Sequence, residues 1–134
     1  MRKLLLILLC APLIGLGQQT YVPDDNFEAY LEANGMGNGI ANDDSVTTAN
    51  IYTVDTLYVN SQSISNLTGI EDFTALTALT CRNNQLTNLD VSQNFALEYL
   101  NCYNNHLTSL DVSQNTALIT LSCANNHLTS LDVS

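Results

Sequence analysis

The chain has 134 residues, of which 46% are hydrophobic and 12% charged, and 13 acidic residues against 3 basic ones give a formal net charge of −10. This length fits one domain, and the apolar content is too high and too regular for a disordered protein. A surface this acidic repels phosphate backbones and anionic membranes, which excludes nucleic-acid binding.

Residues 1–17 have the pattern of a secretory signal peptide. Two basic residues precede an apolar run over 4–16, and Gly15 and Gly17 supply small residues at the −3 and −1 positions of a cleavage site before Gln18. The run is shorter than the roughly 20 apolar residues that a bilayer span needs. We therefore expect a secreted chain without a membrane span, released outside the cell or held at its surface.

Residues 18 to about 50 are predicted to form an N-terminal helical cap. In VPDDNFEAYLEANGMGNG, Asp24 supplies a helix start and Asn34-Gly35 a stop. An apolar helix face lies between them on Phe27, Tyr30 and Leu31. The glycine-rich loop at 37–45 carries oxygen ligands of the kind that calcium binds, but without the EF-hand spacing. A repeat array needs such a cap, because its first coil would otherwise expose its core.

Residues 51–134 are periodic. Three units align on their cysteines, LTALTCRNNQLTNLDVSQNFA from residue 76, LEYLNCYNNHLTSLDVSQNTA from 97 and LITLSCANNHLTSLDVS from 118. An earlier unit, VDTLYVNSQSISNLTGIEDFTA from 54, is one residue longer and has Gln62 where the others have asparagine. This period and the L-x-x-L-x-C-x-N-N-x-L skeleton are typical of leucine-rich repeats. We expect about four coils, the last one incomplete.

The repeat units and the preceding cap segment together predict a β-rich α/β fold, a right-handed leucine-rich repeat solenoid with short parallel strands and a small N-terminal helical cap. Leucine and cysteine point inward on each strand, and the residues between them line an open sheet face. An inward asparagine where the strand turns can satisfy backbone groups of its own turn and of the neighbouring coil. The predicted structural ladder consists of Asn84, Asn105, Asn126, Cys81, Cys102 and Cys123.

A four-ligand zinc site is suggested by Cys102, His106, Cys123 and His127, but the repeat argues against it. The cysteines occupy inward core positions, whereas each histidine lies between two inward residues and therefore points out. Gln85 takes the histidine position of the preceding unit, where the cysteine is nevertheless present. We expect no metal site here, and free, buried thiols, because inward side chains on neighbouring parallel strands run side by side rather than toward each other.

A ladder of carboxylates leaves calcium as an alternative cofactor. Asp90, Asp111 and Asp132 recur one coil apart, and stacked carboxylates can collect calcium. Each of them could instead bind the backbone of its own turn, and no calcium-binding nonapeptide accompanies them. The favoured interpretation is structural, with no cofactor.

The sequence predicts that the chain is not an enzyme. Neither histidine has a nucleophile and an orienting acid at a fixed spacing. The acidic pairs Asp24-Asp25 and Asp43-Asp44 fall in a helix start and a loop, where capping and turns explain them.

A binding face is predicted on the outward residues of the strands, since tyrosine and arginine are enriched in binding hot spots. Removal of the signal peptide leaves Arg82 as the single basic residue, for a formal charge of 1 − 13 = −12. The predicted ligand-binding residues are Tyr58, Asn60, Arg82, Tyr99, Asn101, Tyr103 and Ser122. The partner would be a protein or a glycan. The alternatives are a solvated face on a passive spacer or stalk, or a recognition fragment of a larger multidomain surface protein.

The signal peptide, the VPDDNFEAYLEANGMGNGIANDD segment, the LTGIEDFTAL coil and the tandem LxxLxCxNNxLTxLDVSxN units resemble secreted leucine-rich repeat proteins of Bacteroidetes bacteria and, more loosely, internalin-type repeats. The resemblance implies a recognition module at the bacterial exterior, in proteins that typically carry many more units and often a C-terminal sorting domain for type IX secretion. This chain stops at Ser134, midway through a unit. We therefore expect a truncated or fragmentary member, with self-association through its uncapped last coil.

Overall fold

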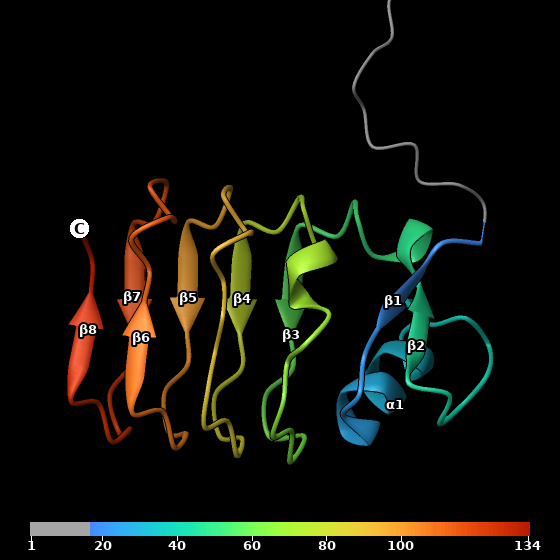
Figure 1. Ribbon diagram of the computed structural model, residues 1–134, viewed down its shortest axis with the longest axis horizontal. Coiled ribbons are helices and arrows are strands. Elements are labelled where there is room, and N and C mark those ends of the chain that lie inside the picture. Colours follow the sequence, from blue (N-terminus) through green and yellow to red (C-terminus); the bar gives the residue numbers. More distant parts are fainter. Residues whose placement is uncertain (1–16) are drawn as a thin grey trace, which may run out of the picture.

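A computed structural model describes residues 17–134 (Figure 1). The predicted signal peptide lies outside these residues, apart from Gly17. In chain order the elements are β1 (Gln19–Tyr21), α1 (Asp25–Ala33), β2 (Ser45–Thr47), the 3-10 turn η1 (Thr48–Asn50), β3 (Thr56–Tyr58), the 3-10 turn η2 (Ile70–Asp72), β4 (Ala78–Thr80), β5 (Tyr99–Asn101), β6 (Ser109–Asp111), β7 (Thr120–Ser122) and β8 (Ser130–Asp132).

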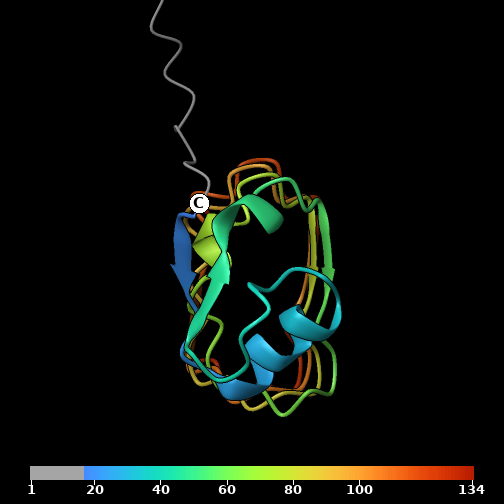
Figure 2. The ribbon, with the colours of Figure 1, turned by 90° about the vertical axis from the view of Figure 1, so that its right-hand side faces the viewer.

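The repeats stack as a solenoid of four coils, which we number one to four over residues 54–75, 76–96, 97–117 and 118–134. Strands β3, β4, β5 and β7 form a parallel sheet in that order, one strand per coil (Figure 1). Their central leucines are in register, Leu57 with Leu79, Leu79 with Leu100 and Leu100 with Leu121. Viewed along the stack, the coils nearly superimpose (Figure 2). The predicted solenoid of stacked parallel strands is confirmed.

A second, smaller sheet lies on the return side of the coils. Strands β6 and β8 pair in parallel, with Leu110 opposite Leu131. The sequence predicts only tight turns there, because Asp, Ser and Asn of the D-V-S-x-N motif are turn-forming residues.

The core is a column of inward side chains running the length of the stack. Leu79, Cys81, Leu100 and Cys102 are all fully buried. Cys123 is only half-buried, so the expectation of a buried thiol is wrong at that rung. The physical reason is that no coil of the described residues packs over coil four.

The inward asparagines hold neighbouring coils together. Asn84 donates from Nδ2 to the carbonyls of Val59, at 2.7 Å, and Cys81, at 2.9 Å. Its Oδ1 accepts from the backbone N–H groups of Gln62 and Ile64, both at 3.1 Å. One side chain thus satisfies four backbone groups, and Asn105 and Asn126 each make three of the corresponding bonds, one at Oδ1 and two from Nδ2, in coils three and four.

Gln62 does not act as the asparagine of coil one. Its side chain is exposed and donates to the carbonyl of Asn60 at 2.9 Å. The Gln62 backbone N–H is instead satisfied by Asn84 of the next coil. Glutamine is one methylene longer than asparagine, and coil one borders the cap rather than another repeat.

A second asparagine ladder, not singled out in the sequence, runs through the return side. Asn94 donates to the carbonyls of Ile70 and Phe73, at 2.9 and 3.2 Å. One coil later, Asn115 donates to Val91, at 2.8 Å, and Asn94, at 3.0 Å. Both side chains are buried. The last residue of the D-V-S-x-N motif is therefore a structural link between coils.

The cap covers the coil-one end of the stack (Figure 2). Helix α1 begins after Asp24 and ends before Asn34, at the predicted start and stop. Its inward residue Phe27 stacks on Phe73 of coil one, with ring centroids 6.4 Å apart. The antiparallel pair β1–β2 completes the cap. These two strands are not predicted from the sequence, since each has only three residues and they pair over a long separation, as with Thr20 and Val46.

None of the helices formed by residues 17–134 has the length and apolar character to cross a membrane.

Candidate functional site

The candidate site is the outward side of the four-stranded sheet, which we call the open face. Register places its residues in three rows that run across the coils. The first row is Thr56, Ala78, Tyr99 and Thr120, and the second is Tyr58, Thr80, Asn101 and Ser122. The third, one alternation further along each strand, is Asn60, Arg82, Tyr103 and Ala124. Sequence alternation thus brings all seven predicted binding residues onto one surface.

The tyrosines are the exposed large hydrophobic side chains of the open face. Tyr58 is 57% exposed, Tyr99 37% and Tyr103 38%. The neighbours of Tyr99 across its row, Ala78 and Thr120, are small. Small neighbours leave the sides of an aromatic ring open to contact, so Tyr99 can offer apolar area to a ligand.

Tyr103 is oriented by the next coil. The Nδ2 of Asn125 donates a hydrogen bond of 2.7 Å to the Tyr103 hydroxyl. Ala124 follows Tyr103 in the third row and carries only a methyl group. The tyrosine ring is therefore directed across coil four and held there, which reduces the conformational entropy that a ligand would have to remove on binding.

The polar residues of the open face are partly engaged within the protein. Asn60 Oδ1 accepts from the hydroxyl of Thr80 and from the backbone N–H of Arg82. Thr80 is consequently only 7% exposed, although alternation places it on this side. Asn101 Oδ1 accepts from the backbone N–H of Tyr103 at 3.1 Å. The side-chain carbonyl oxygens of Asn60 and Asn101 thus accept hydrogen bonds within the protein. Their NH2 groups can donate hydrogen bonds to a ligand.

The open face is nearly neutral in a strongly acidic chain. Arg82 is exposed and is the single basic residue among residues 17–134. Exposed Asp55 and Glu98 directly precede β3 and β5, at the edge of the face. Aromatic rings, amides and hydroxyls on a flat sheet suit stacking and hydrogen bonding to a neutral polar surface, whereas an acidic ligand would have one cation to bind.

The structure separates the four candidate zinc ligands. Cys102 is fully buried, whereas His106 and His127 are exposed. Burial raises the pKa of Cys81 far above its usual range and that of Cys102 to about 12. A metal would require thiolates, and these thiols are neutral and face the core. The cysteines are therefore part of the packing.

The aspartate ladder is used by its own turns. Asp90 accepts from the backbone N–H of Ser92 at 2.9 Å, and Asp111 makes the same bond to Ser113. In coil four, Asp132 accepts from the N–H of Ser134 at 3.0 Å. Bonds from the side chain and backbone of the following serine lower the pKa of Asp90 and of Asp132. These hydrogen bonds support a structural role of the three aspartates in their own turns rather than calcium binding.

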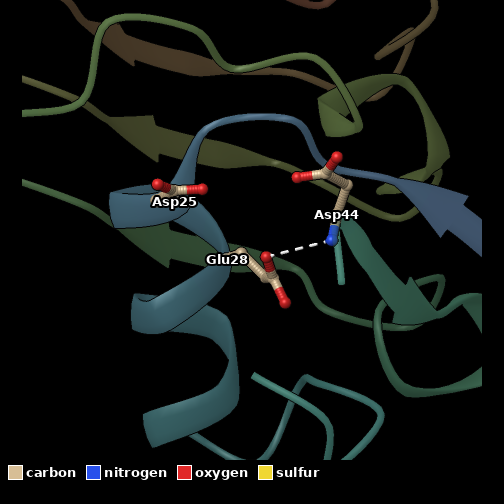
Figure 3. A group of neighbouring side chains, drawn as sticks. All are labelled: Asp25, Glu28 and Asp44. Carbon is tan, nitrogen blue, oxygen red and sulfur yellow. Dashed lines mark hydrogen bonds between the residues drawn. The ribbon is translucent and has the colours of Figure 1, made fainter. Parts of the chain in front are cut away.

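A cluster of three acidic residues in the cap was not recognised in the sequence. Carboxylate oxygens of Asp25, Glu28 and Asp44 lie within 4.8 Å of one another (Figure 3). Glu28 is only 1% exposed and accepts from the backbone N–H groups of Asp43, at 3.1 Å, and Asp44, at 3.2 Å. The buried carboxylate thus already has partners on both oxygens. Its evident role is to fasten the 37–45 loop to α1.

The neighbouring carboxylate of Glu32 has the same role. Its oxygens accept from the backbone N–H groups of Asn38, at 2.6 Å, and Gly39, at 3.0 and 3.1 Å. Asn38 in turn donates to Asp43, and this bond is the main cause that lowers the pKa of Asp43. The calcium-like residues of the loop are explained by these bonds.

Comparison with known proteins identifies internalin-like repeats. No protein-family model matches the chain. Internalin J of Listeria monocytogenes serotype 4b (strain F2365) is 41% identical over 74 residues, which is 55% of this chain and 8% of that protein. Among solved structures, the functional domain of InlJ from Listeria monocytogenes, which includes a cysteine ladder, is 36% identical with a TM-score of 0.59 over 90% of this chain and 32% of that one.

A second solved structure, the internalin InlF from Listeria monocytogenes strain 4b F2365, has a TM-score of 0.66. It is 22% identical, over 85% of this chain and 37% of that one, and so supports the fold alone. The chain spans about a third of each solved relative and a much smaller part of Internalin J. The resemblance to internalin-type repeats is therefore confirmed for the repeat fold.

Proposed function

We propose that these internalin-like repeats form a secreted, non-catalytic module that binds a protein or glycan ligand at the bacterial cell exterior through the open face. The observation that carries this proposal is the pair of tyrosines on one coil, with Tyr103 held in place by Asn125 at 2.7 Å and Tyr99 flanked by small residues. They lie four positions apart on one extended segment, or about 13 Å at 3.3 Å per residue. That separation suits two contact points of a macromolecular ligand.

The surrounding surface supports recognition rather than chemistry. The exposed tyrosines lie among hydroxyls, amide NH2 groups and Arg82, and tyrosine and arginine contribute disproportionately to binding energy. Each histidine lies outside the open face, at the turn that follows the strand. Secretion rests on the predicted signal peptide, and the likeness to internalins supports a role in protein interaction.

The test is a double variant of the open face, Tyr99→Ala with Tyr103→Ala. Wild-type and variant chains are screened against a glycan array and a panel of purified extracellular proteins, and Kd is measured for any ligand retained. We expect affinity to fall by at least about tenfold, because each truncated hot-spot aromatic costs about 1 kcal/mol or more. The variant should keep the wild-type circular dichroism spectrum, since both side chains are on the surface.

A matched control removes two exposed tyrosines outside the open face, Tyr21→Ala with Tyr52→Ala. It should bind as tightly as the wild type. Equal affinity of the Tyr99 and Tyr103 double variant would reject the open face as the binding surface. If the wild-type chain retains no ligand in either screen, the straight stack of coils (Figure 2) is better described as a spacer.

A further inference from the structure

Two imidazoles lie side by side on the outside of the stack, at the turn that follows each strand. His106 of coil three and His127 of coil four have ring centroids 5.9 Å apart and ring planes at 9°. Both side chains are exposed. The fold does not require this pair, because Gln85 takes the same position in coil two.

The backbone holds the two positions one rung apart. The N–H of His106 donates to the carbonyl of Leu86 at 2.8 Å, and the N–H of His127 donates to Leu107 at 2.8 Å. The residues that follow the histidines, Leu107 and Leu128, belong to the apolar core or pack against it. Neighbouring rungs of such a ladder are about 4.8 Å apart. The backbone at His106 and His127 is therefore fixed, whereas their exposed side chains can rotate.

We propose that His106 and His127 together bind one divalent transition-metal ion, of the type of Ni²⁺ or Zn²⁺, as a two-histidine surface site that joins coils three and four. Imidazole nitrogen is a preferred ligand of these ions. Water completes the coordination, because the pair is exposed. This site is separate from the open face and from the cysteines, whose thiols point into the core.

The spacing of the two rings, though not yet their orientation, is close to that of a chelate. Metal–nitrogen bonds of about 2.0–2.1 Å, at bond angles between square and tetrahedral, place two imidazole centres roughly 4.5–5 Å apart. The observed centroid distance of 5.9 Å has to shorten by about 1 Å. Because each nitrogen lone pair lies in its ring plane, the stacked rings also have to turn until both planes contain the ion. Exposed side chains can make both changes by χ1 and χ2 rotations.

The chain as a whole favours cations at this surface. Among residues 17–134 the acidic residues far outnumber the single arginine, so the electrostatic potential around the stack attracts positive ions. Specificity for transition metals over calcium comes from the nitrogen donors, because calcium takes oxygen ligands. The acidic group Asp25, Glu28 and Asp44 lies in the cap, at the other end of the stack, and does not contribute.

The test is a titration of the chain with Ni²⁺ by isothermal calorimetry, which avoids the thiol oxidation that Cu²⁺ would cause. The variants are His106→Gln and His127→Gln, which both introduce the side chain that Gln85 has in coil two, so each should fold with a wild-type circular dichroism spectrum. We expect one Ni²⁺ per wild-type chain and an affinity at least about tenfold lower in either variant, since chelation needs both rings. Equal affinity in the wild type and either single variant would overturn the proposal.

Two further variants make the result specific. Gln85→His adds a third rung to the ladder and should tighten Ni²⁺ binding or add a second ion. Cys123→Ser should leave binding unchanged, and a loss there equal to that of the histidine variants would assign the ion to the thiol instead. Because the ion bridges two coils, Ni²⁺ should also raise the melting temperature of the wild type more than that of either single variant. Identical shifts would contradict a bridging site.

Discussion

Asp24 joins the N-terminal cap to the first coil through Ser65. Its Oδ2 accepts from the backbone N–H of Ser65 at 2.9 Å, from the Ser65 hydroxyl at 3.0 Å and from the N–H of Asn66 at 3.0 Å. Its Oδ1 accepts from the N–H groups of Asn26 and Phe27 and so caps α1. The carboxylate of Asp24, a residue that is 8% exposed, therefore both caps α1 and binds the backbone of coil one.

Replacement of Asp24 by alanine should destabilise the chain strongly. The change removes a helix cap worth about 1 kcal/mol and leaves coil-one N–H groups without a partner, at about 1–3 kcal/mol. We expect the free energy of unfolding to fall by about 2–4 kcal/mol, measured by urea denaturation. Asp25→Ala is the matched control, because Asp25 is exposed in the same turn, and it should cost less than about 1 kcal/mol. A similar loss for both variants would show that Asp24 has no special role.

The inward asparagines should be far less tolerant than their outward neighbours. Asn105→Ala removes the bonds from Nδ2 to Cys81 and Cys102, at 3.0 and 3.1 Å, and the bond from the Leu86 N–H to Oδ1 at 3.1 Å. Buried backbone groups left unpaired cost about 1–3 kcal/mol each, so we expect a loss of at least about 2 kcal/mol in urea denaturation.

The control for Asn105 is the residue before it. Asn104 is exposed and has a φ of 55°, a left-handed conformation that glycine adopts without strain. Asn104→Gly should therefore change the free energy of unfolding by less than about 1 kcal/mol, even though it gives up a side-chain bond to Asn83. A larger loss than that of Asn105→Ala would contradict the assignment of the ladder.

Thiol reactivity should increase toward coil four. Cys81 and Cys102 are buried, and desolvation raises the pKa of both, to about 12 for Cys102. Almost no thiolate forms there at about pH 8, whereas Cys123 is half-buried. We expect iodoacetamide to modify Cys123 at least about tenfold faster than the other two in the native chain, measured by peptide mass spectrometry. Urea should abolish the difference, and equal native rates would refute the burial order.

Acid should weaken the turn at Asp90. Bonds from the Ser92 hydroxyl and backbone N–H lower the pKa of Asp90 below its ordinary 3.8. A carboxylate whose pKa is depressed on folding stabilises the protein above pH 3.8, and this contribution is lost as the pH falls through the lowered pKa. Asp90 is largely exposed, so the contribution is below about 1 kcal/mol. Asp90→Asn should be less stable than the wild type at about pH 6 and equally stable at about pH 2.

The control for the pH measurement is Ser92→Ala, which removes the hydroxyl but keeps the backbone N–H. It should show a smaller pH-dependent change than the wild type. If the stability difference between wild type and Asp90→Asn is the same at both pH values, the carboxylate charge is not involved.

The fold was predictable because the sequence repeat determines both the length of each coil and the register between neighbouring strands. The cysteine spacing aligned the units, and the leucines of neighbouring units are paired in the sheet, as with Leu79 and Leu100. The start and stop of α1 followed from Asp24 and Asn34, whose local hydrogen bonds end the helix on either side. The pairs β1–β2 and β6–β8 were not predicted, because β1 and β2 lie outside the repeat and the residue types around the Ser-Leu-Asp segments of β6 and β8 are those of turns.

The candidate site was predictable in its composition but not in its contacts. Alternation assigned Tyr103 to the outside, whereas its bond to Asn125 depends on the rotamers of two coils. Thr80 was expected on the outside as well, and Asn60 covers it. Gln62 stands at the sequence position of an inward asparagine, but its side chain is exposed and does not take that role.

Taken alone, the sequence determined which way the strand side chains of the repeats point, because a strand places successive side chains on opposite faces whatever lies beside it. The tertiary structure decided which side chains meet: Asp24 with Ser65, Tyr103 with Asn125 and His106 with His127. These pairs are 21 to 41 positions apart, since 127 − 106 = 21 and 65 − 24 = 41. Their contacts depend on the stacking of coil on coil and of the cap on coil one, which brings residues distant in the sequence into contact.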